Sequence, residues 1–258
     1  MTLGTLRKIR NSFLFISAAI LGAIITLVAV IAIHFEEKPA PEKKTEKEPI
    51  AFFASKKRAM VFYRFLSKVY DIVNPFFYDE TMRETIVNWA GVREGSLVLD
   101  VGCGTGYTTE GILKKLSDGE VVCLDFTRQQ LEKAVIKLRE RGNTMFLMGD
   151  AENLPFKEDV FDTVLSTGAI EYFPNPKRDI QEMSRVAKPG GKVAIVGPEF
   201  RWFKKLLLNR VLYTPSMEEL QKIYSEVKLK NIKTFLSGVN TFFGTDKYAV
   251  IIVGVKAS

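Results

Sequence analysis

The stretch VLDVGCGTGYTT, residues 98–109, has the residue types of a ligand-binding turn. A short apolar run is followed by Gly102, Gly104 and Gly106 at alternate positions, and a helical pattern begins behind them. Glycines at such a turn let the backbone approach a ligand closely, and the first N–H groups of the helix point at it. A dinucleotide site requires the spacing G-x-G-x-x-G to seat a pyrophosphate, whereas the third glycine here comes one residue early. Asp100 precedes the turn, and its carboxylate favours a cationic ligand over a pyrophosphate.

Two further acids follow the next two predicted strands. Asp125 ends the apolar run VVCLD, and Asp150 stands in GDAENLPF. Because parallel α/β sheets bind ligands at the carboxyl ends of their strands, Asp125 is placed to accept hydrogen bonds from ribose hydroxyls and Asp150 from an adenine amino group. Taken singly, Asp125 can equally be a helix cap, a role for which Thr127 competes, and Asp150 can be an ordinary turn residue. Together with Asp100 they predict a nucleoside site without a phosphate cradle.

Strands and helices alternate along the chain from residue 96 onward. Apolar runs predict strands over 97–102, 120–125, 144–148, 160–166 and 192–197. Helical periodicity predicts helices over 79–90, 107–117, 127–141, 177–187 and 216–226, and KPGGK at 188–192 predicts a helix stop and a turn. This alternation is typical of an α/β fold with a Rossmann-like, doubly wound, mostly parallel sheet. KNIKTFLSGV and KYAVIIVGVKA predict an antiparallel pair at one edge, which makes a seven-stranded sheet with an antiparallel edge strand.

An uninterrupted apolar run, residues 13–33, predicts one N-terminal transmembrane helix, because about 20 helical residues cross a hydrocarbon core of about 30 Å. A cleaved signal peptide is the alternative, but its apolar region is shorter, about 7–15 residues. The charged, proline-containing stretch that follows predicts a solvated linker. The predicted organisation is therefore a membrane anchor at 1–35, a linker at 36–50 and a folded domain at 51–258.

The charge distribution indicates an anionic partner. The net charge is +7, and Lys and Arg are concentrated in residues 50–70 and 201–258. Basic ends on a balanced core suit a membrane or a nucleic acid, and the apolar run favours the membrane. Residues 51–70 mix aromatic and basic side chains at helical spacing, which predicts a helix that packs on the domain, lies at lipid headgroups, or does both. Lys and Arg flank the apolar run on both sides, so charge alone does not orient it.

Histidine and cysteine usage restricts the chemistry. The only histidine, His34, stands at the end of the apolar run, so no Ser-His-Asp or Cys-His mechanism operates within the folded domain. The two cysteines, Cys103 and Cys123, have no C-x-x-C neighbour, which argues against a zinc site or a redox pair and favours two small buried residues. We therefore expect no metal site.

The motifs together resemble those of a known family. VLDVGCGTG, the LD pair at 124–125, GDAENLPF and RVAKPGGKVAI are similar to the motif set of class I S-adenosylmethionine-dependent methyltransferases, over residues 60–258. The resemblance implies S-adenosylmethionine as cofactor, with its methionine moiety over the glycines and its amino group near Asp100. It also implies that Asp125 binds the ribose and Asp150 the adenine. The residues that the resemblance assigns to the cofactor are Tyr70, Asp100, Gly102, Cys103, Gly104, Gly106, Asp125, Phe126, Asp150, Ala151 and Thr167.

A narrower resemblance concerns the substrate. YDIVNPFFYDETMRE, STGAIEYFPNPKRDIQEMSRV, IVGPEFRWF and LYTPSMEEL are similar to the plastid-type methyltransferases of prenylated benzoquinones, which C-methylate tocopherol and plastoquinone precursors and are membrane-associated. The ubiquinone and menaquinone C-methyltransferases share the Tyr70-Asp71 motif, but they carry an Arg-Asn pair where this sequence has Ile170-Glu171. The resemblance implies a prenylated quinol as substrate, which enters from lipid.

Glu171 is the predicted catalytic base. A hydroquinone ring carbon becomes nucleophilic when a phenolic proton is lost, and a carboxylate within hydrogen-bond reach, or a water that it holds, can take that proton. Tyr172 is predicted to orient the ring; the alternative is that both are ordinary residues of the rim. The aromatic, apolar and basic stretch 199–213 predicts a lid over the substrate that also touches the membrane.

Other functions stay open at this point. The same fold can methylate a lipid headgroup amine or a sterol, or the chain can be a non-catalytic, membrane-tethered partner protein that binds the cofactor. The glycine spacing disfavours a nicotinamide enzyme. We expect the catalytic domain in the cytoplasm, because S-adenosylmethionine is made there and the unpaired cysteines agree with a reducing compartment.

Overall fold

The computed structural model describes residues 58, 60, 61, 80–200, 213, 215–241 and 244–257. The predicted anchor at 13–33, the linker and Tyr70 lie outside these residues, as do nearly all of the predicted helix at 51–70 and residues 201–212 of the predicted lid. Among the described residues, no helix combines the length and the apolar composition needed to cross a membrane.

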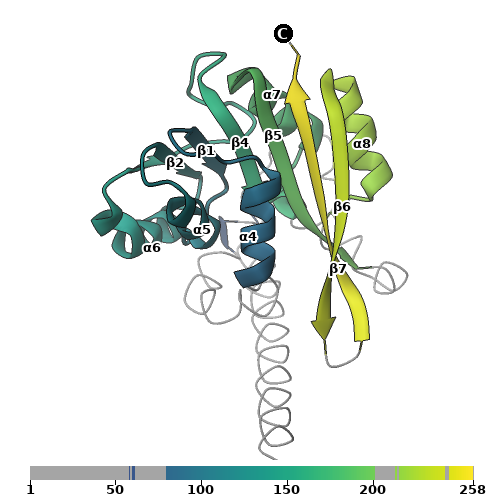
Figure 1. Cartoon of the computed structure of the whole chain (residues 1–258), viewed down its shortest axis with the longest axis horizontal. Coiled ribbons are helices and arrows are strands. Elements are labelled where there is room, and N and C mark those ends of the chain that lie inside the picture. Colours follow the sequence, from purple (N-terminus) through teal and green to yellow (C-terminus); the bar gives the residue numbers. More distant parts are fainter. Residues whose placement is uncertain are drawn as a thin grey trace, which may run out of the picture.

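The described residues form one seven-stranded sheet (Figure 1). Its strands are β1 (Leu97–Val101), β2 (Glu120–Asp125), β3 (Thr144–Met148), β4 (Phe161–Thr167), β5 (Ala187–Phe200), β6 (Leu229–Thr241) and β7 (Gly244–Lys256). They lie in the order β3-β2-β1-β4-β5-β7-β6, with parallel pairing from β3 to β5. The predicted α/β, Rossmann-like sheet is confirmed, and each predicted strand is found close to its expected bounds except β5, which begins five residues earlier.

The predicted antiparallel pair at one edge is confirmed as β6 and β7, but the strand that runs against the others is not the edge strand itself. β7 lies between β5 and β6 and is antiparallel to both. Val250, Ile251 and Ile252 of β7 are buried, whereas Lys230 and Lys233 of β6 are exposed. An apolar strand gains most from neighbours on both sides, so β7 takes the interior place and the lysine-bearing β6 takes the edge.

Helices cover both faces of the sheet (Figure 1). They are α4 (Glu80–Trp89), α5 (Tyr107–Lys115), α6 (Arg128–Leu138), α7 (Pro176–Val186) and α8 (Met217–Glu226), with the short 3-10 helices η2 (Arg139–Arg141) and η3 (Ile170–Tyr172). One hydrophobic cluster joins α4, α5 and α6 to the sheet, and a second joins α7 and α8 to the opposite face. The five predicted helices are confirmed, and the last turn of the one predicted over 127–141 is the separate η2.

The start of β5 differs from the prediction. KPGGK was expected to form a turn, but β5 already begins at Ala187, which pairs with Phe161 of β4. The pairing register then shifts before Lys192, and Gly190 has a φ of 76°. The turn-forming residues therefore make an irregularity inside the strand instead of a loop, because the β4 edge offers hydrogen-bond partners on both sides of it.

The residues of β1 alternate between the two faces. Val98 packs in the cluster that contains Ile112 of α5, and Leu99 packs in the cluster that contains Ile180 of α7. Because successive side chains of a strand point to opposite faces, Asp100 points to the α5 side, as Val98 does. There Thr109 donates a 2.6 Å hydrogen bond from its Oγ1 to Oδ2 of Asp100.

Candidate functional site

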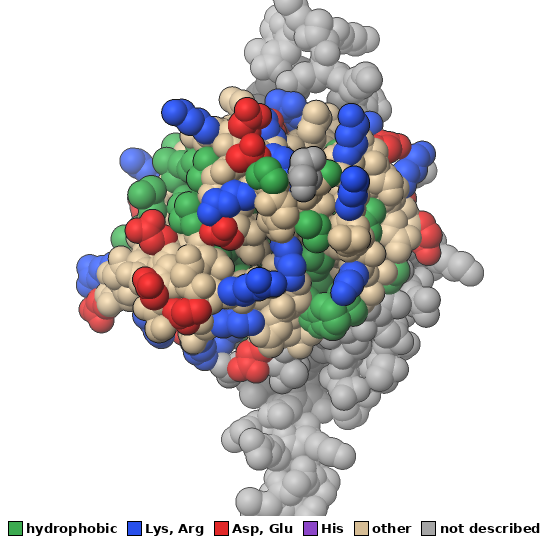
Figure 2. All heavy atoms as spheres, turned by 45° about the horizontal axis from the view of Figure 1, so that its top comes forward, with side chains coloured by type: hydrophobic (Ala, Val, Ile, Leu, Met, Phe, Trp, Pro, Cys, Tyr) green, Lys and Arg blue, Asp and Glu red, His purple; other side chains and the backbone are tan. Residues whose placement is uncertain are grey.

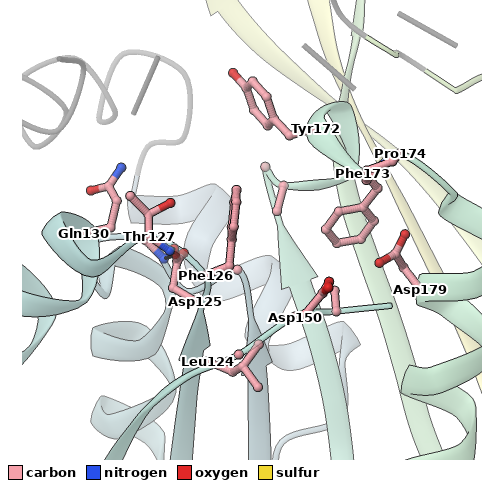
Figure 3. Close-up of a pocket in the computed structure, with 16 residues that line it drawn as sticks. Leu124, Asp125, Phe126, Thr127, Gln130, Asp150, Tyr172, Phe173, Pro174 and Asp179 are labelled. Atoms are coloured by element: carbon pink, nitrogen blue, oxygen red, sulfur yellow. Dashed lines mark hydrogen bonds between the residues drawn. The ribbon is translucent and has the colours of Figure 1, made fainter. Parts of the chain in front are cut away.

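A pocket opens at the carboxyl ends of the parallel strands (Figure 3). It is open to solvent, and its empty space, with the solvent at its mouth included, amounts to about 670 Å³. Its walls come from the turn after β1, the junction of β2 with α6, the loop after β3, and the segment from the end of β4 into α7. The lining residues are Gly102, Gly104, Leu124, Asp125, Phe126, Thr127, Gln130, Gly149, Asp150, Ala151, Gly168, Ala169, Tyr172, Phe173, Pro174 and Asp179.

The glycine turn is held against the end of β2. The N–H of Gly102 donates a 2.7 Å hydrogen bond to the carbonyl of Leu124. Gly102 has a φ of 70°, and a Cβ at this position would lie 2.7 Å from the Cβ of Ala169 across the pocket floor. Gly106 has a φ of 80° at the start of α5, and a Cβ there would lie 2.6 Å from Cδ1 of Leu138. Glycine is therefore required at both positions by backbone conformation and by space.

Asp125 lines the pocket at the end of β2 and is 7% exposed. Its Oδ2 accepts a hydrogen bond from the N–H of Gly104 at 2.9 Å, and its Oδ1 accepts one from the N–H of Thr127 at 2.8 Å. Burial raises the pKa of this carboxyl, and the two N–H donors oppose that rise. Thr127 is the N-cap residue of α6, so Asp125 does not cap this helix. Each carboxylate oxygen keeps a further lone pair that can accept a hydrogen bond from a ligand.

Asp150 lies in the loop after β3 and also lines the pocket. Its Oδ1 accepts a hydrogen bond from the N–H of Glu152 at 3.1 Å, and its carbonyl accepts one from the N–H of Asn153 at 3.1 Å. The turn role considered for Asp150 is therefore present, and the residue also lines the pocket (Figure 3).

Asp100 is 1% exposed and does not line the pocket. Burial raises the pKa of its carboxyl to about 7, the hydrogen bond from Thr109 opposes the rise, and the nearby charge of Asp125 adds to it. The Oδ1 atom of Asp100 is buried without a hydrogen-bond partner among the described residues. The carboxylate thus lies beneath the glycine turn, on the α5 side of the sheet.

The remaining predicted cofactor residues fall into three groups. Two line the pocket beside the aspartates, namely Phe126 and Ala151. Three belong to the elements that form the pocket but do not contribute to its wall, namely Cys103, Gly106 and Thr167. Tyr70 lies outside the described residues.

The two predicted catalytic residues take different positions. Both belong to η3, but Tyr172 lines the pocket, at its upper rim in Figure 3, while Glu171 does not. Glu171 is 5% exposed, and burial raises the pKa of its carboxyl to about 8. Its Oε2 has no hydrogen-bond partner in the described part of the chain, and its backbone carbonyl accepts the N–H of Tyr213 at 3.4 Å. Only Tyr172 of this pair is brought to the pocket wall.

Several residues that line the pocket were not predicted from the sequence. Most of them are chain neighbours of predicted ones, but Gln130 and Asp179 come from the first turns of α6 and α7. The fold itself carries a signal for such residues, because every helix of a parallel α/β sheet begins at the carboxyl edge where the ligand binds. The missed residues are Leu124, Thr127, Gln130, Gly149, Gly168, Ala169, Phe173, Pro174 and Asp179.

The charged side chains that line the pocket are all of one sign. They are Asp125, Asp150 and Asp179, all acidic. Figure 2 turns the amino ends of the strands toward the viewer, where Lys and Arg side chains are interspersed with Asp and Glu. Burial lowers the pKa of Lys192 at that end, and three neighbouring cations lower it further, namely Arg93, Lys233 and Lys115. A polyphosphate therefore does not suit the pocket, whereas a cationic nucleoside does.

The residues present also fit S-adenosylmethionine by their shape and hydrogen-bonding groups. Gly102 packs directly against Ala169, so backbone atoms instead of a side chain form this part of the pocket wall. Carboxylate oxygens of Asp125 and Asp150 are acceptors, as ribose hydroxyls and an adenine amino group require.

Comparison with known proteins identifies the family. A family profile described as a methyltransferase domain matches residues 99–195, from β1 into β5. The chain is 35% identical over 240 residues to the chloroplastic 2-methyl-6-phytyl-1,4-hydroquinone methyltransferase of Spinacia oleracea, and the match covers 90% of this chain and 67% of that protein. The chain belongs to the S-adenosylmethionine-dependent methyltransferases. Its cofactor is S-adenosylmethionine.

Two further comparisons concern another plant relative and a solved structure. It is 38% identical over 213 residues to the chloroplastic 2-methyl-6-phytyl-1,4-hydroquinone methyltransferase 2 of Oryza sativa subsp. japonica, a match that covers 80% of this chain. The methyltransferase spans 61% of the length of that rice relative. The solved structure of phosphoethanolamine N-methyltransferase 2 from Haemonchus contortus, in complex with S-adenosyl-L-methionine, has a TM-score of 0.63 at 16% identity and covers 84% of this chain and 62% of its own. That likeness shows the fold.

Proposed function

We propose that this methyltransferase C-methylates the ring of a prenylated quinol in quinone biosynthesis, at a membrane surface. The observation that carries the proposal is the 35% and 38% identity to plant proteins named for methylating 2-methyl-6-phytyl-1,4-hydroquinone. A pocket with only acidic charged residues in its described wall, and with Tyr172 at its rim, is compatible with a neutral aromatic acceptor beside a cationic cofactor.

The proposed cofactor contacts follow from the position and hydrogen bonding of the aspartates. Asp125 accepts the ribose hydroxyls through the lone pairs that its two backbone hydrogen bonds leave over. Asp150 accepts a hydrogen bond from the adenine amino group, and the turn from Gly102 to Gly106 runs under the methionine moiety, whose amino group lies toward Asp100. Phe126 and Ala151 contact the adenosine portion, and Cys103, Thr167 and Tyr70 complete the proposed cofactor set.

S-adenosylmethionine, when bound, supplies a methyl group that its sulfonium already activates. The chain therefore has to orient the quinol ring and to accept a phenolic proton. We assign the proton transfer to the Glu171 carboxylate and the orientation of the ring to Tyr172. Glu171 adjoins Tyr172 in η3 but does not line the pocket, so the proposed transfer runs through a water that its carboxylate holds. Burial raises its pKa to about 8, and a general base works best when its pKa lies near the working pH.

The proposed position in the cell follows from the sequence and from the cofactor. The apolar run 13–33 anchors the chain as a single-pass protein, residues 36–50 form the linker, and the domain at 51–258 faces the cytoplasm. A prenylated substrate dissolves in lipid, so an enzyme tethered there meets it without extracting it into water. Protease added to intact cells or spheroplasts should leave the domain uncut, and digestion before lysis would show that this orientation is wrong.

The substrate assignment is tested with the full-length chain in detergent or lipid vesicles. The protein is incubated with methyl-labelled S-adenosylmethionine and either 2-methyl-6-phytyl-1,4-hydroquinone or its oxidised quinone. We expect label on a ring carbon of the hydroquinone and none on the quinone, because only the reduced ring supplies a nucleophilic carbon. Label on an oxygen, a sterol or a phospholipid amine would overturn the substrate class, and cofactor binding without turnover on any acceptor would indicate a non-catalytic partner protein.

Glu171→Gln tests the proposed base in the same assay. General-base assistance contributes about 10²–10⁴ in rate, so turnover should fall by at least about 10² while cofactor affinity stays nearly unchanged. The wild-type rate should rise between pH 7 and pH 9, as Glu171 ionises, and the Gln variant should lack that rise. A Gln variant with normal turnover would remove Glu171 from the mechanism.

A further inference from the structure

Asp179 is a pocket residue to which neither the motifs nor the comparisons assign a role. It belongs to the first turn of α7, is 1% exposed and lines the pocket. Asp150 and Phe173 line the same pocket, and Figure 3 labels all three side chains in its wall. Two carboxylates from different elements thus line one pocket.

The local structure of α7 explains how Asp179 is held. Asn175 caps the helix, because its side chain accepts the N–H of Arg178 at 3.2 Å, and Pro176 follows as the first helical residue. The N–H of Asp179 donates to the carbonyl of Asn175 at 3.1 Å. A negative charge in the first turn of a helix is favourable, which explains an acid at this position but not its placement in the pocket wall.

The loop that carries Asp150 is tied to α7 by arginines. Nε of Arg178 donates to the carbonyl of Glu152 at 3.1 Å. Arg185 donates from Nη2 to the carbonyl of Leu154 at 3.0 Å and from Nη1 to the carbonyl of Phe156 at 2.9 Å. These hydrogen bonds fix the loop after β3 relative to α7, so the two carboxylates keep a set spacing before any ligand arrives.

The chemistry of a purine matches two carboxylates in one pocket. The exocyclic amino group of adenine offers two N–H donors, so it can donate one hydrogen to each carboxylate. A 6-oxo purine presents a carbonyl oxygen at the same position, which donates nothing and is repelled by the carboxylate oxygens. Sites built to receive a donor reject ligands that lack it.

We propose that Asp179 binds the adenine amino group together with Asp150, and that the pair selects a 6-amino purine over a 6-oxo purine. The proposal rests on the proposed function, since it takes this pocket as the adenosine site. Asp179 is then a specificity residue of the cofactor site, supplied by α7 and not by one of the strand ends on which the motifs lie.

Ligand binding by the full-length chain in detergent tests the proposal without turnover. The ligands are S-adenosylhomocysteine and its 6-oxo analogue S-inosylhomocysteine, with affinities measured by calorimetry. Wild type should favour the adenine form by at least about a hundredfold, since two lost hydrogen bonds to charged groups are at stake. Asp179→Asn should reduce that preference about tenfold or more, because its amide can turn an N–H toward the 6-oxo group.

A matched control separates direct contact from a general charge effect. Glu226→Gln removes an acid that pairs with Lys177 at 2.8 Å near the start of α7, and Glu226 does not line the pocket. This variant should keep the wild-type preference between the two ligands. Asp179→Ser, which retains a polar side chain in the first turn, replaces the Asn variant where thermal melting shows that Asn unfolds the protein.

The outcomes distinguish the assignment of the pocket to the cofactor from the selectivity role of Asp179. If wild type binds neither ligand, the assignment of the pocket to the cofactor is wrong. If wild type binds S-adenosylhomocysteine but favours it by less than about tenfold, or if the Asp179 variants weaken both ligands equally, the selectivity role of Asp179 is overturned while the cofactor site stands.

Discussion

The main-chain N–H of Gly104 donates a 2.9 Å hydrogen bond to Oδ2 of Asp125. This bond joins the turn after β1 to the end of β2, two strands that pair in parallel up to Val101↔Leu124. The other oxygen, Oδ1, accepts the N–H of Thr127 at 2.8 Å. Asp125 thus holds the glycine turn in place and faces the pocket at the same time, so its substitution affects both stability and ligand binding.

Asp125→Ala should weaken S-adenosylmethionine binding by about ten- to a hundredfold, the cost of about 1.5–3 kcal/mol for one lost hydrogen bond to a charged group. Asp125→Asn should also lower the free energy of unfolding, because its amide N–H₂ must face the N–H of either Gly104 or Thr127. Calorimetry and urea unfolding measure the two effects, and unchanged affinity in both variants would exclude the ribose contact.

Asp162→Asn is the matched control for the two Asp125 variants. Asp162 also receives a backbone N–H, from Leu97 at 2.9 Å, and an ammonium, from Lys188 at 2.7 Å, but it does not line the pocket. We expect a loss of stability with unchanged cofactor affinity. A comparable affinity loss in this control would mean that the Asp125 effect reflects general loosening of the sheet.

Gly102→Ala should abolish cofactor binding and destabilise the fold more than Gly95→Ala does. Both glycines have similar φ values, 70° and 71°, so the conformational strain is the same in the two variants. A Cβ at Gly102 meets the Cβ of Ala169 at 2.7 Å, whereas one at Gly95 has nothing within 4 Å. Thermal melting of both variants separates the effect of the contact with Ala169 from the effect of the positive φ. Ala169→Gly added to Gly102→Ala should recover part of the lost stability. Equal destabilisation of the two single variants would contradict the close approach.

The free energy of unfolding of the ligand-free protein should fall as pH rises from about 5 to about 8. Burial raises the pKa of Glu171 to about 8 and that of Asp100 to about 7, so the folded chain binds more protons than the unfolded chain in this window. The contribution of Glu171 has an upper limit on the order of 5 kcal/mol.

Urea unfolding at pH 5 and pH 8.5 checks this dependence. Glu171→Gln cannot ionise, so it should match wild type at the lower pH and exceed its stability at the higher one. If the free energy of unfolding changes with pH equally in wild type and in Glu171→Gln, Glu171 is not a buried carboxyl group of raised pKa.

Arg185→Lys should loosen the loop after β3. Arg185 pairs with Glu182, Nη2 to Oε2 at 2.7 Å, and also donates to the carbonyls of Leu154 and Phe156. A single ammonium cannot reach all three partners, so we expect a loss of about 1–3 kcal/mol in stability. Hydrogen exchange at the amide of Leu154 should become faster. Arg139→Lys, at an exposed position in η2, is the control and should change neither quantity.

The sequence alone determined the order and type of the elements and the place of the ligand site. Apolar runs and helical periodicity are local patterns, and a parallel α/β sheet brings all strand ends to one edge. The glycine turn, Asp125 and Asp150 were therefore predictable, because each immediately follows a strand. The interior place of β7 also follows from its sequence, because β7 is apolar whereas its neighbour β6 carries exposed lysines.

Only the tertiary structure decided how individual side chains face the pocket. The alternation of β1 places Asp100 beneath α5, and the 3-10 turn of η3 puts Tyr172 in the pocket wall while it buries Glu171. Asp179 enters the site because α7 packs on the sheet and the arginines bind the loop after β3 to it. These positions depend on packing between segments distant in sequence, which no local pattern of residues records.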